Sequence, residues 1–137
     1  MFFSSKLNKF NGALLTFDYG YEAKENYNTL QSVKKHRYIS LLSQPGNADI
    51  TSHINFKLFS EILKKNDLEV RKIVTQSEFL KKMGIIERAN MISKKMTFKE
   101  KANVFFRLKK LLSYKEMGSL FKVLFAQKKS GKFSLGF

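Results

Sequence analysis

Side chains that can do chemistry gather in the first 56 residues of the chain. Asp18-Tyr19-Gly20 directly follows the apolar run 12–17, which is typical of a buried strand in a parallel sheet. Open α/β sheets place ligand-contacting groups at the carboxyl ends of their strands. A carboxylate there can orient a guanidinium through paired hydrogen bonds, or assist the loss of its proton. Asp18 can equally cap its own turn beside a glycine, so both interpretations stay open.

A second polar group occupies segment 45–56, which combines turn formers with one carboxylate, one imidazole and two hydroxyls. It ends the long stretch 21–52, where we expect a loop apart from a short helix near 29–35. Loops of this length in compact domains usually serve a function. From residue type, Asp49, Thr51 and His53 either tie the loop to its own backbone or contact a substrate.

Several kinds of active site are excluded by what the sequence lacks. There is no cysteine and no G-x-S-x-G elbow, which excludes thiol nucleophiles and the usual serine hydrolase motif. The only histidines, His36 and His53, lack the spacing of a helical metal motif, so no metal site is expected. The seven glycines include no G-x-G pair, so nothing in the sequence predicts a turn that cradles nucleotide phosphates.

The elements that must position these groups are strands near 13–17, 68–74 and 120–126, with helices between them. Asn55 predicts a helix cap, and the Thr75/Glu78 and Thr97/Glu100 pairs predict capping boxes at two further helix starts. The order of elements is that of an α/β fold, and the 137 residues are expected to form a single domain, 1–137. We expect the basic tail from residue 127 to fray.

The net charge of +15 suggests a polyanionic partner, but only four of the 26 basic residues are arginine. A solvated lysine surface is therefore favoured, and a small basic nucleic-acid-binding or protein-interaction module is the alternative function. No apolar run reaches the roughly 18 residues of a membrane span. The absence of cysteine fits a reducing compartment, so we expect the cytoplasm, with the mitochondrial matrix as the alternative because the first ten residues are basic and acid-free.

Five short motifs occur in a fixed order along residues 12–126. They are D-Y-G at 18–20, H-R-Y at 36–38, P-G-x-x-D-I-T-x-H-I-x-F at 45–56, E-F-L-x-x-M-G-I at 78–85 and M-G-x-L-F-K-V-L at 117–124. In this order they resemble the MidA family, S-adenosylmethionine-dependent methyltransferases linked to the assembly of respiratory complex I. Asn55 departs from the pattern, because the family usually has aspartate there.

The resemblance implies the C-terminal part of a Rossmann-like class I methyltransferase sheet. The three predicted strands would be its fifth, sixth and seventh, with the last antiparallel and inserted between the other two. The implied cofactor is S-adenosylmethionine, and the implied substrate is an arginine of a complex I subunit. Asp18 would be catalytic, and the substrate side would consist of Tyr19, Gly20, His36, Asp49, Thr51 and His53.

The family's cofactor-binding motifs have no counterpart in this sequence. There is no glycine-rich turn, no acidic residue after a second strand and no N-E-x-x-D-A-L-P-like segment. We therefore expect the chain alone to be inactive and not to bind the cofactor tightly. A separately encoded N-terminal half would complete the sheet, and without it the strand near 13–17 would present an open edge.

Overall fold

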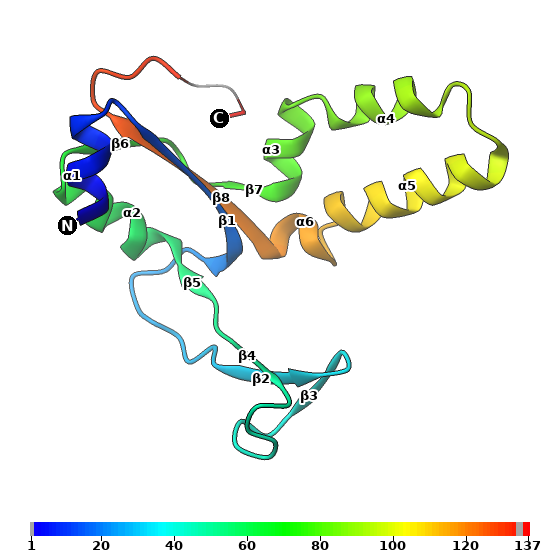
Figure 1. Ribbon diagram of the computed structural model, residues 1–137, viewed down its shortest axis with the longest axis horizontal. Coiled ribbons are helices and arrows are strands. Elements are labelled where there is room, and N and C mark those ends of the chain that lie inside the picture. Colours follow the sequence, from blue (N-terminus) through cyan, green and yellow to red (C-terminus); the bar gives the residue numbers. More distant parts are fainter. Residues whose placement is uncertain (1, 134–135) are drawn as a thin grey trace.

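The computed structural model describes residues 2–133 and 136–137, which form helices and strands (Figure 1). In chain order the elements are α1 (Phe2–Lys9), β1 (Ala13–Tyr21), β2 (Gln31–Lys34), β3 (Arg37–Ile39), β4 (Asp49–Thr51), β5 (Ile54–Asn55), α2 (Phe56–Lys65), β6 (Leu68–Val70), β7 (Val74–Thr75), α3 (Gln76–Lys82), α4 (Ile85–Ser93), α5 (Phe98–Leu112), α6 (Met117–Leu120) and β8 (Phe121–Lys128).

The main sheet is built around β8, which runs antiparallel between β1 and β6. The α/β class and the antiparallel last strand between the other two are therefore confirmed. The sheet has five strands rather than the three expected, because β5 adds to the end of β1 and the predicted strand 68–74 is divided into β6 and β7. Three residues between Val70 and Val74 face two between Val123 and Ala126, which is a β-bulge.

One edge of β1 has no partner over most of its length. Its other edge pairs with β8 from Ala13 to Tyr19, whereas its pairing with β5 begins only at Gly20. Among the described residues, the expected open edge at 13–17 is thus present. Such an edge is a template for a further strand.

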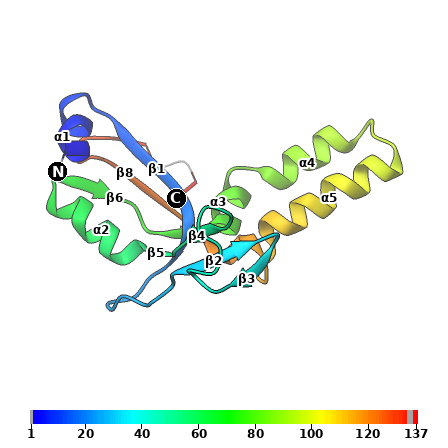
Figure 2. The same cartoon turned by 60° about the horizontal axis from the view of Figure 1, so that its bottom comes forward.

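A second, three-stranded antiparallel sheet, ordered β3-β2-β4, stands apart from the main sheet on the β5 side (Figures 1 and 2). The loop expected over 21–52 is therefore interrupted by three strands, and the short helix expected near 29–35 is wrong. Lys35 and His36, both with positive φ, close a tight hairpin between β2 and β3. β2 also needs β4, which lies far along the chain, and so no local pattern indicates it.

The core lies on both faces of β8. Leu124 and Ala126 pack with α2 on one face, where the buried cluster also includes Phe56, Leu63 and Leu68. Val123 packs with Val74 and Phe79 on the other face. A central strand buried on both faces needs the nearly continuous apolar run that residues 121–126 supply.

Where it is described, the tail after β8 is held by hydrogen bonds and ring contacts, so the expectation that it frays is wrong there. Gln127 is buried, and its amide donates to the carbonyls of Gly131 and Phe133 at 2.9 and 3.3 Å. The Phe133 ring lies 5.0 Å from that of Phe125, and the Phe137 ring lies 5.3 Å from that of Phe79. Residues 134–135 of this tail lie outside the described residues.

None of the helices described over 2–133 and 136–137 has the length and apolar character to cross a membrane.

The three predicted helix starts are confirmed. Asn55 accepts from the Leu58 amide, and both capping boxes are formed, Thr75 with Glu78 and Thr97 with Glu100. The backbone amide and then the hydroxyl of Thr75 are the main causes that hold the pKa of Glu78 below its ordinary value of 4.5. The Thr97 hydroxyl and amide lower the pKa of Glu100 in the same way.

These caps predict a specific acid sensitivity. Because the folded-state pKa of Glu78 is depressed, its contribution to stability is complete above the unfolded pKa and is lost as the pH falls through the folded one. Glu78→Gln should therefore flatten the acid limb of the unfolding free energy below about pH 4.5, measured by urea titration at several pH values. Glu61→Gln, on the exposed side of α2, should keep the wild-type slope.

Candidate functional site

The end of β1 meets β5 in the one parallel pairing of the described sheets, with Gly20 opposite Ile54 and Tyr21 opposite Asn55. Segment 45–56 therefore ends beside the exit of the first strand, as predicted. Gly20 is buried, and a Cβ at this position would overlap the Phe56 ring and lie 2.7 Å from the Ile54 carbonyl oxygen. Only glycine lets the two motif-bearing segments approach this closely.

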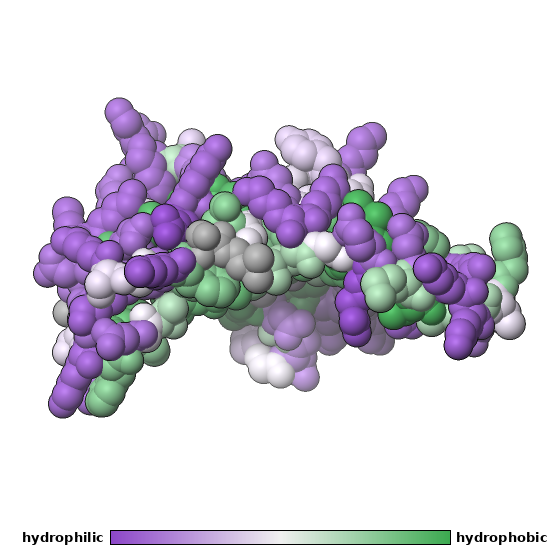
Figure 3. All heavy atoms as spheres, turned by 90° about the horizontal axis from the view of Figure 1, so that it is seen from above, coloured by the Kyte–Doolittle hydropathy of each residue, from purple (hydrophilic) through white to green (hydrophobic). Residues whose placement is uncertain are grey.

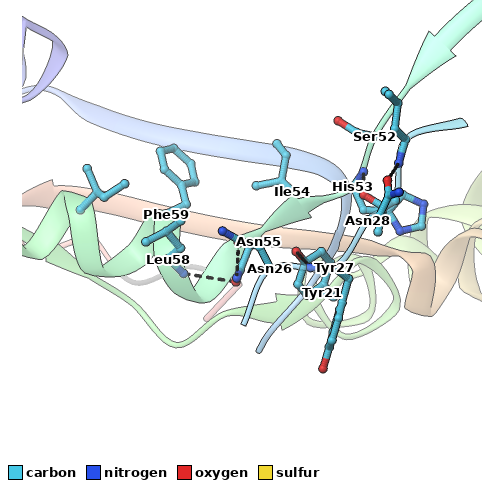
Figure 4. A pocket seen from close by; sticks show the side chains of 13 residues that line it. Tyr21, Asn26, Tyr27, Asn28, Ser52, His53, Ile54, Asn55, Leu58 and Phe59 are labelled. Carbon is cyan, nitrogen blue, oxygen red and sulfur yellow. Dashed lines mark hydrogen bonds between the residues drawn. The ribbon is translucent and has the colours of Figure 1, made fainter. Parts of the chain in front are cut away.

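A cavity of about 470 Å³ opens at this junction, between β5, the start of α2 and the segment 26–30 (Figure 4). Aromatic and neutral polar side chains dominate its lining, with Tyr21, Tyr27, Asn28, His53, Asn55 and Phe59 among them. No carboxylate or basic side chain other than the His53 imidazole lines it, among the described residues. Such a lining suits stacking and hydrogen bonding with a peptide or a planar group more than ion pairing.

The side-chain oxygen and nitrogen of Asn55 both form hydrogen bonds at the edge of the cavity. Its oxygen caps α2 by accepting from the Leu58 amide at 3.3 Å. Its nitrogen donates to the Asn26 side chain at 3.1 Å (Figure 4). It also donates to the carbonyls of Ala23 and Glu25 at 3.1 and 3.3 Å, so that the 23–26 loop is tied to the helix start. An aspartate, which the family usually has here, could cap the helix but could not donate.

We expect Asn55→Asp to loosen this loop without unwinding α2. The carboxylate keeps the cap but loses the donated bonds and faces two carbonyl oxygens, so stability should fall by about 1–2 kcal/mol. Amide exchange measured by NMR should rise in 23–30 and stay unchanged in α2. Unchanged exchange in both segments would show that Asn55 matters only as a cap, which aspartate can replace.

The aromatic groups around the junction form two sets of ring contacts. The Tyr19 ring lies 4.2 Å from that of Phe121 and is nearly parallel to the His53 imidazole, with centroids 6.1 Å apart and 15° between the planes. Tyr21 packs on Tyr27 at 4.9 Å, and its hydroxyl accepts from the Tyr27 amide at 2.9 Å. The backbone amide of His53 donates to the Thr29 hydroxyl. The structure thus brings Tyr19, Gly20 and His53 together.

Asp18 lies within β1, where the open edge gives way to pairing with β5. It is half-buried, and among the described residues its Oδ1 accepts from the adjacent Tyr19 amide alone, at 2.8 Å. Lys122 stands opposite in the register, but its Nζ donates to the Ser119 carbonyl. Among the described residues, Asp18 makes no ion pair. Its carboxylate is available to a guanidinium, although it does not line the cavity.

The other predicted site residues lie in the small sheet. The Thr51 hydroxyl accepts from the side-chain amide of Gln31 at 3.1 Å across the β2–β4 pair, a structural bond to a side chain rather than to the backbone of its own loop. Asp49 is exposed at the start of β4, and His36 is exposed at the tip of the β2–β3 hairpin. Neither joins the cavity. The described residues contain no group of three histidines or carboxylates placed to hold a metal ion.

Sequence reasoning missed much of the cavity lining. Asn26, Tyr27 and Asn28 belong to the stretch that showed no period, and Asn55 was recognised only as a helix cap. The alternation of amide and aromatic side chains at 26–28 is the one available signal, because such side chains are unusual together in a purely solvated loop.

Comparison with known proteins gives one family. A family model described as "Putative S-adenosyl-L-methionine-dependent methyltransferase" matches residues 2–74. The chain is 34% identical over 92 residues to the mitochondrial protein arginine methyltransferase NDUFAF7 of Xenopus tropicalis, covering 67% of this chain and 21% of that protein. It is 30% identical over 83 residues to the mitochondrial NDUFAF7 homolog of Caenorhabditis elegans, covering 61% and 19%.

Two solved structures from Burkholderia thailandensis share the fold. One, an uncharacterized protein, superposes with a TM-score of 0.77 at 26% identity and covers 97% of this chain and 38% of that one. The other, bound to S-adenosyl-homocysteine, gives a TM-score of 0.76 at 29% identity, covering 92% and 34%. The chain thus spans about a fifth of the curated relatives and about a third of the solved ones.

The mixed sheet with its flanking helices therefore defines an α/β protein of the class to which these solved relatives belong. More than half of the residues fall within the family match. The chain belongs to the MidA-like family of S-adenosyl-L-methionine-dependent methyltransferases.

Proposed function

We propose that this chain forms the methyl-acceptor side of a S-adenosylmethionine-dependent protein arginine methyltransferase that acts in the assembly of respiratory complex I. The observation that carries the proposal is the Gly20–Ile54 pairing, which places two family-like motifs at one strand end. The names of the NDUFAF7 relatives support arginine as the acceptor and support the mitochondrial alternative over the cytoplasm.

The described residues do not fit the cofactor itself. No strand in them leads through a glycine-rich turn into a helix, since α2 and α3 begin at Asn55 and Thr75 with side-chain caps. The cavity at the junction also lacks a carboxylate that could accept from ribose hydroxyls. We therefore place the cofactor site on polypeptide outside these 137 residues, paired with the open edge of β1.

The residues of this chain would act on the acceptor. Asp18 would hold the guanidinium through paired, charge-assisted hydrogen bonds and take up its proton. The rings of Tyr19, Tyr21 and His53 would flank the peptide that carries it, and stacking on a guanidinium is favourable for such rings. Orientation of the nucleophile is the main contribution expected of a protein in such a transfer.

The test is reconstitution. The chain is mixed with the Burkholderia thailandensis relative from which the matching segment has been removed, and transfer of a radiolabelled methyl group to an arginine peptide is counted. Label should reach arginine only when both parts are present. Equal transfer without the chain, or labelling of a residue other than arginine, would contradict the proposal.

A further inference from the structure

Helices α4 and α5 form a hairpin that extends away from the main sheet, as Figures 1 and 2 show. We call residues 85–112 the helical arm. The short connection 94–97 makes the two helices antiparallel neighbours, and they contact each other. At its base the arm contacts α3 and α6.

The arm is far less buried than a helix pair of its size normally is. Ala89 and Ser93 are its only buried residues, and the 15-residue helix α5 has none. Helices of about this length are marginal in water unless an apolar face is packed. The apolar side chains of the arm therefore indicate a surface that is covered in use.

A shallow groove of about 260 Å³ runs between the two helices. Apolar side chains recur along its walls at helical spacing: Ile85, Ala89 and Ile92 on α4, and Val104, Leu108 and Leu111 on α5. Arg88 and Arg107 complete the lining, one from each wall, and they are two of the four arginines in the chain. From above, hydrophobic residues show through an otherwise hydrophilic surface over this part of the molecule (Figure 3).

The charge around the groove is strongly positive and unneutralised. Segment 81–115 carries eleven lysines and arginines against two glutamates. One of these, Glu100, is engaged in the cap of α5. Neither of the two ion pairs found among the described residues lies in this segment. A partner that covers the groove must therefore bring negative charge.

We propose that the groove of the helical arm binds an amphipathic, acidic α-helix of a protein partner. Its apolar face would lie between Ile92 and Leu108, and its carboxylates would meet Arg88 and Arg107. Helix-in-groove recognition needs an apolar trough with anchors one helical turn apart, and this groove supplies both. Nucleic-acid phosphates would leave the apolar walls exposed, and a flat membrane surface does not fill a groove. The proposal does not depend on the methyltransferase activity.

The probe is a synthetic helical peptide with leucine at positions i, i+3, i+4 and i+7 and glutamate on both flanks. Its comparators are the same peptide with lysine in place of glutamate, and a scrambled peptide of the same composition. The full 137-residue chain is tethered through its N-terminus, which prevents self-association, and binding is followed by surface plasmon resonance. The acidic helix should bind saturably, and both comparators should not.

Matched variants localise the binding. Arg88→Glu with Arg107→Glu should lower the affinity for the acidic helix at least about tenfold, because both charge pairs become repulsive. Lys24→Glu with Lys35→Glu makes the same change in net charge on exposed residues outside the arm and should alter affinity less than about twofold. Circular dichroism confirms that both pairs of variants keep their helices, and Ile92→Asp tests the apolar wall separately.

Four results would overturn the proposal. The first is that the scrambled peptide binds as tightly as the acidic helix, and the second is that the Lys24 and Lys35 changes weaken binding as much as the Arg88 and Arg107 changes. The third is that duplex DNA or phosphatidylglycerol vesicles bind while the acidic helix does not. The fourth is that a second copy of the chain occupies the groove. The last would appear in sedimentation of the free chain as a dimer that Arg88→Glu and Arg107→Glu dissociate.

Discussion

Replacing Gly20 by alanine should destabilise the protein by about 3 kcal/mol, which is a large fraction of the total stability of a marginally stable domain. The added methyl group would overlap the ring of Phe56, which is completely buried, and would approach the Ile54 carbonyl. The ring cannot move aside without disturbing the core cluster of α2 and β8, and the carbonyl belongs to the strand pairing itself. The loss would appear in urea unfolding followed by circular dichroism.

Two further variants separate this cause from a general effect of glycine replacement. Gly12→Ala, at the other end of β1, meets first the end of the Leu7 side chain at 2.9 Å, which can rotate, so its effect should be small. Phe56→Leu should partly rescue Gly20→Ala by removing the ring. Equal destabilisation by Gly12→Ala and Gly20→Ala, without rescue, would show that close approach of β1 and β5 is not what Gly20 provides.

Asp18→Ala should lower methyl transfer by the reconstituted enzyme at least about 100-fold, the lower end of what a positioned acid–base group contributes. Cofactor binding should survive, since we place that site elsewhere. The fold should survive as well, because Asp18 bonds only to its neighbour's amide and forms no ion pair among the described residues. Initial rates and cofactor affinity measured on the same samples separate the two effects.

The matched variants are Asp18→Asn and Glu61→Ala. The asparagine amide keeps the shape of the carboxylate but can neither accept a proton nor balance a cation, so Asp18→Asn should transfer methyl groups as slowly as Asp18→Ala. Glu61→Ala removes one exposed carboxylate from α2, away from the junction, and should leave the rate unchanged. Unchanged turnover in Asp18→Ala would remove this residue from the site.

What the sequence predicts well here depends on short-range patterns. The three helix caps are set by residues three positions apart, and the strand 121–126 is indicated by an apolar run that only Lys122 interrupts. The order of strands, with β8 between β1 and β6, came from the family resemblance, since no local pattern specifies which strands pair. These parts of the fold are confirmed.

The features missed depend on contacts between distant residues. β2 is four residues long and is fixed by pairing with β4 across a long connection, and the bulge at 71–73 exists only against β8. The tail is held because Phe133 packs on Phe125 and Phe137 packs on both Phe79 and Phe125. Composition alone does not reveal these ring contacts. In the candidate site, Tyr19, Gly20 and His53 could be grouped in advance from their motifs. The donor role of Asn55 could not, because it requires the carbonyls of the 23–26 loop to be in place.

The most direct measurement is a calorimetric titration of S-adenosylmethionine into the chain alone, into the truncated Burkholderia thailandensis relative, and into their mixture. If this chain carries the acceptor wall, the titration of the chain alone will show no binding, and the mixture will bind the cofactor and form a stoichiometric complex through the edge of β1. Micromolar binding of the cofactor by the chain alone would contradict the account.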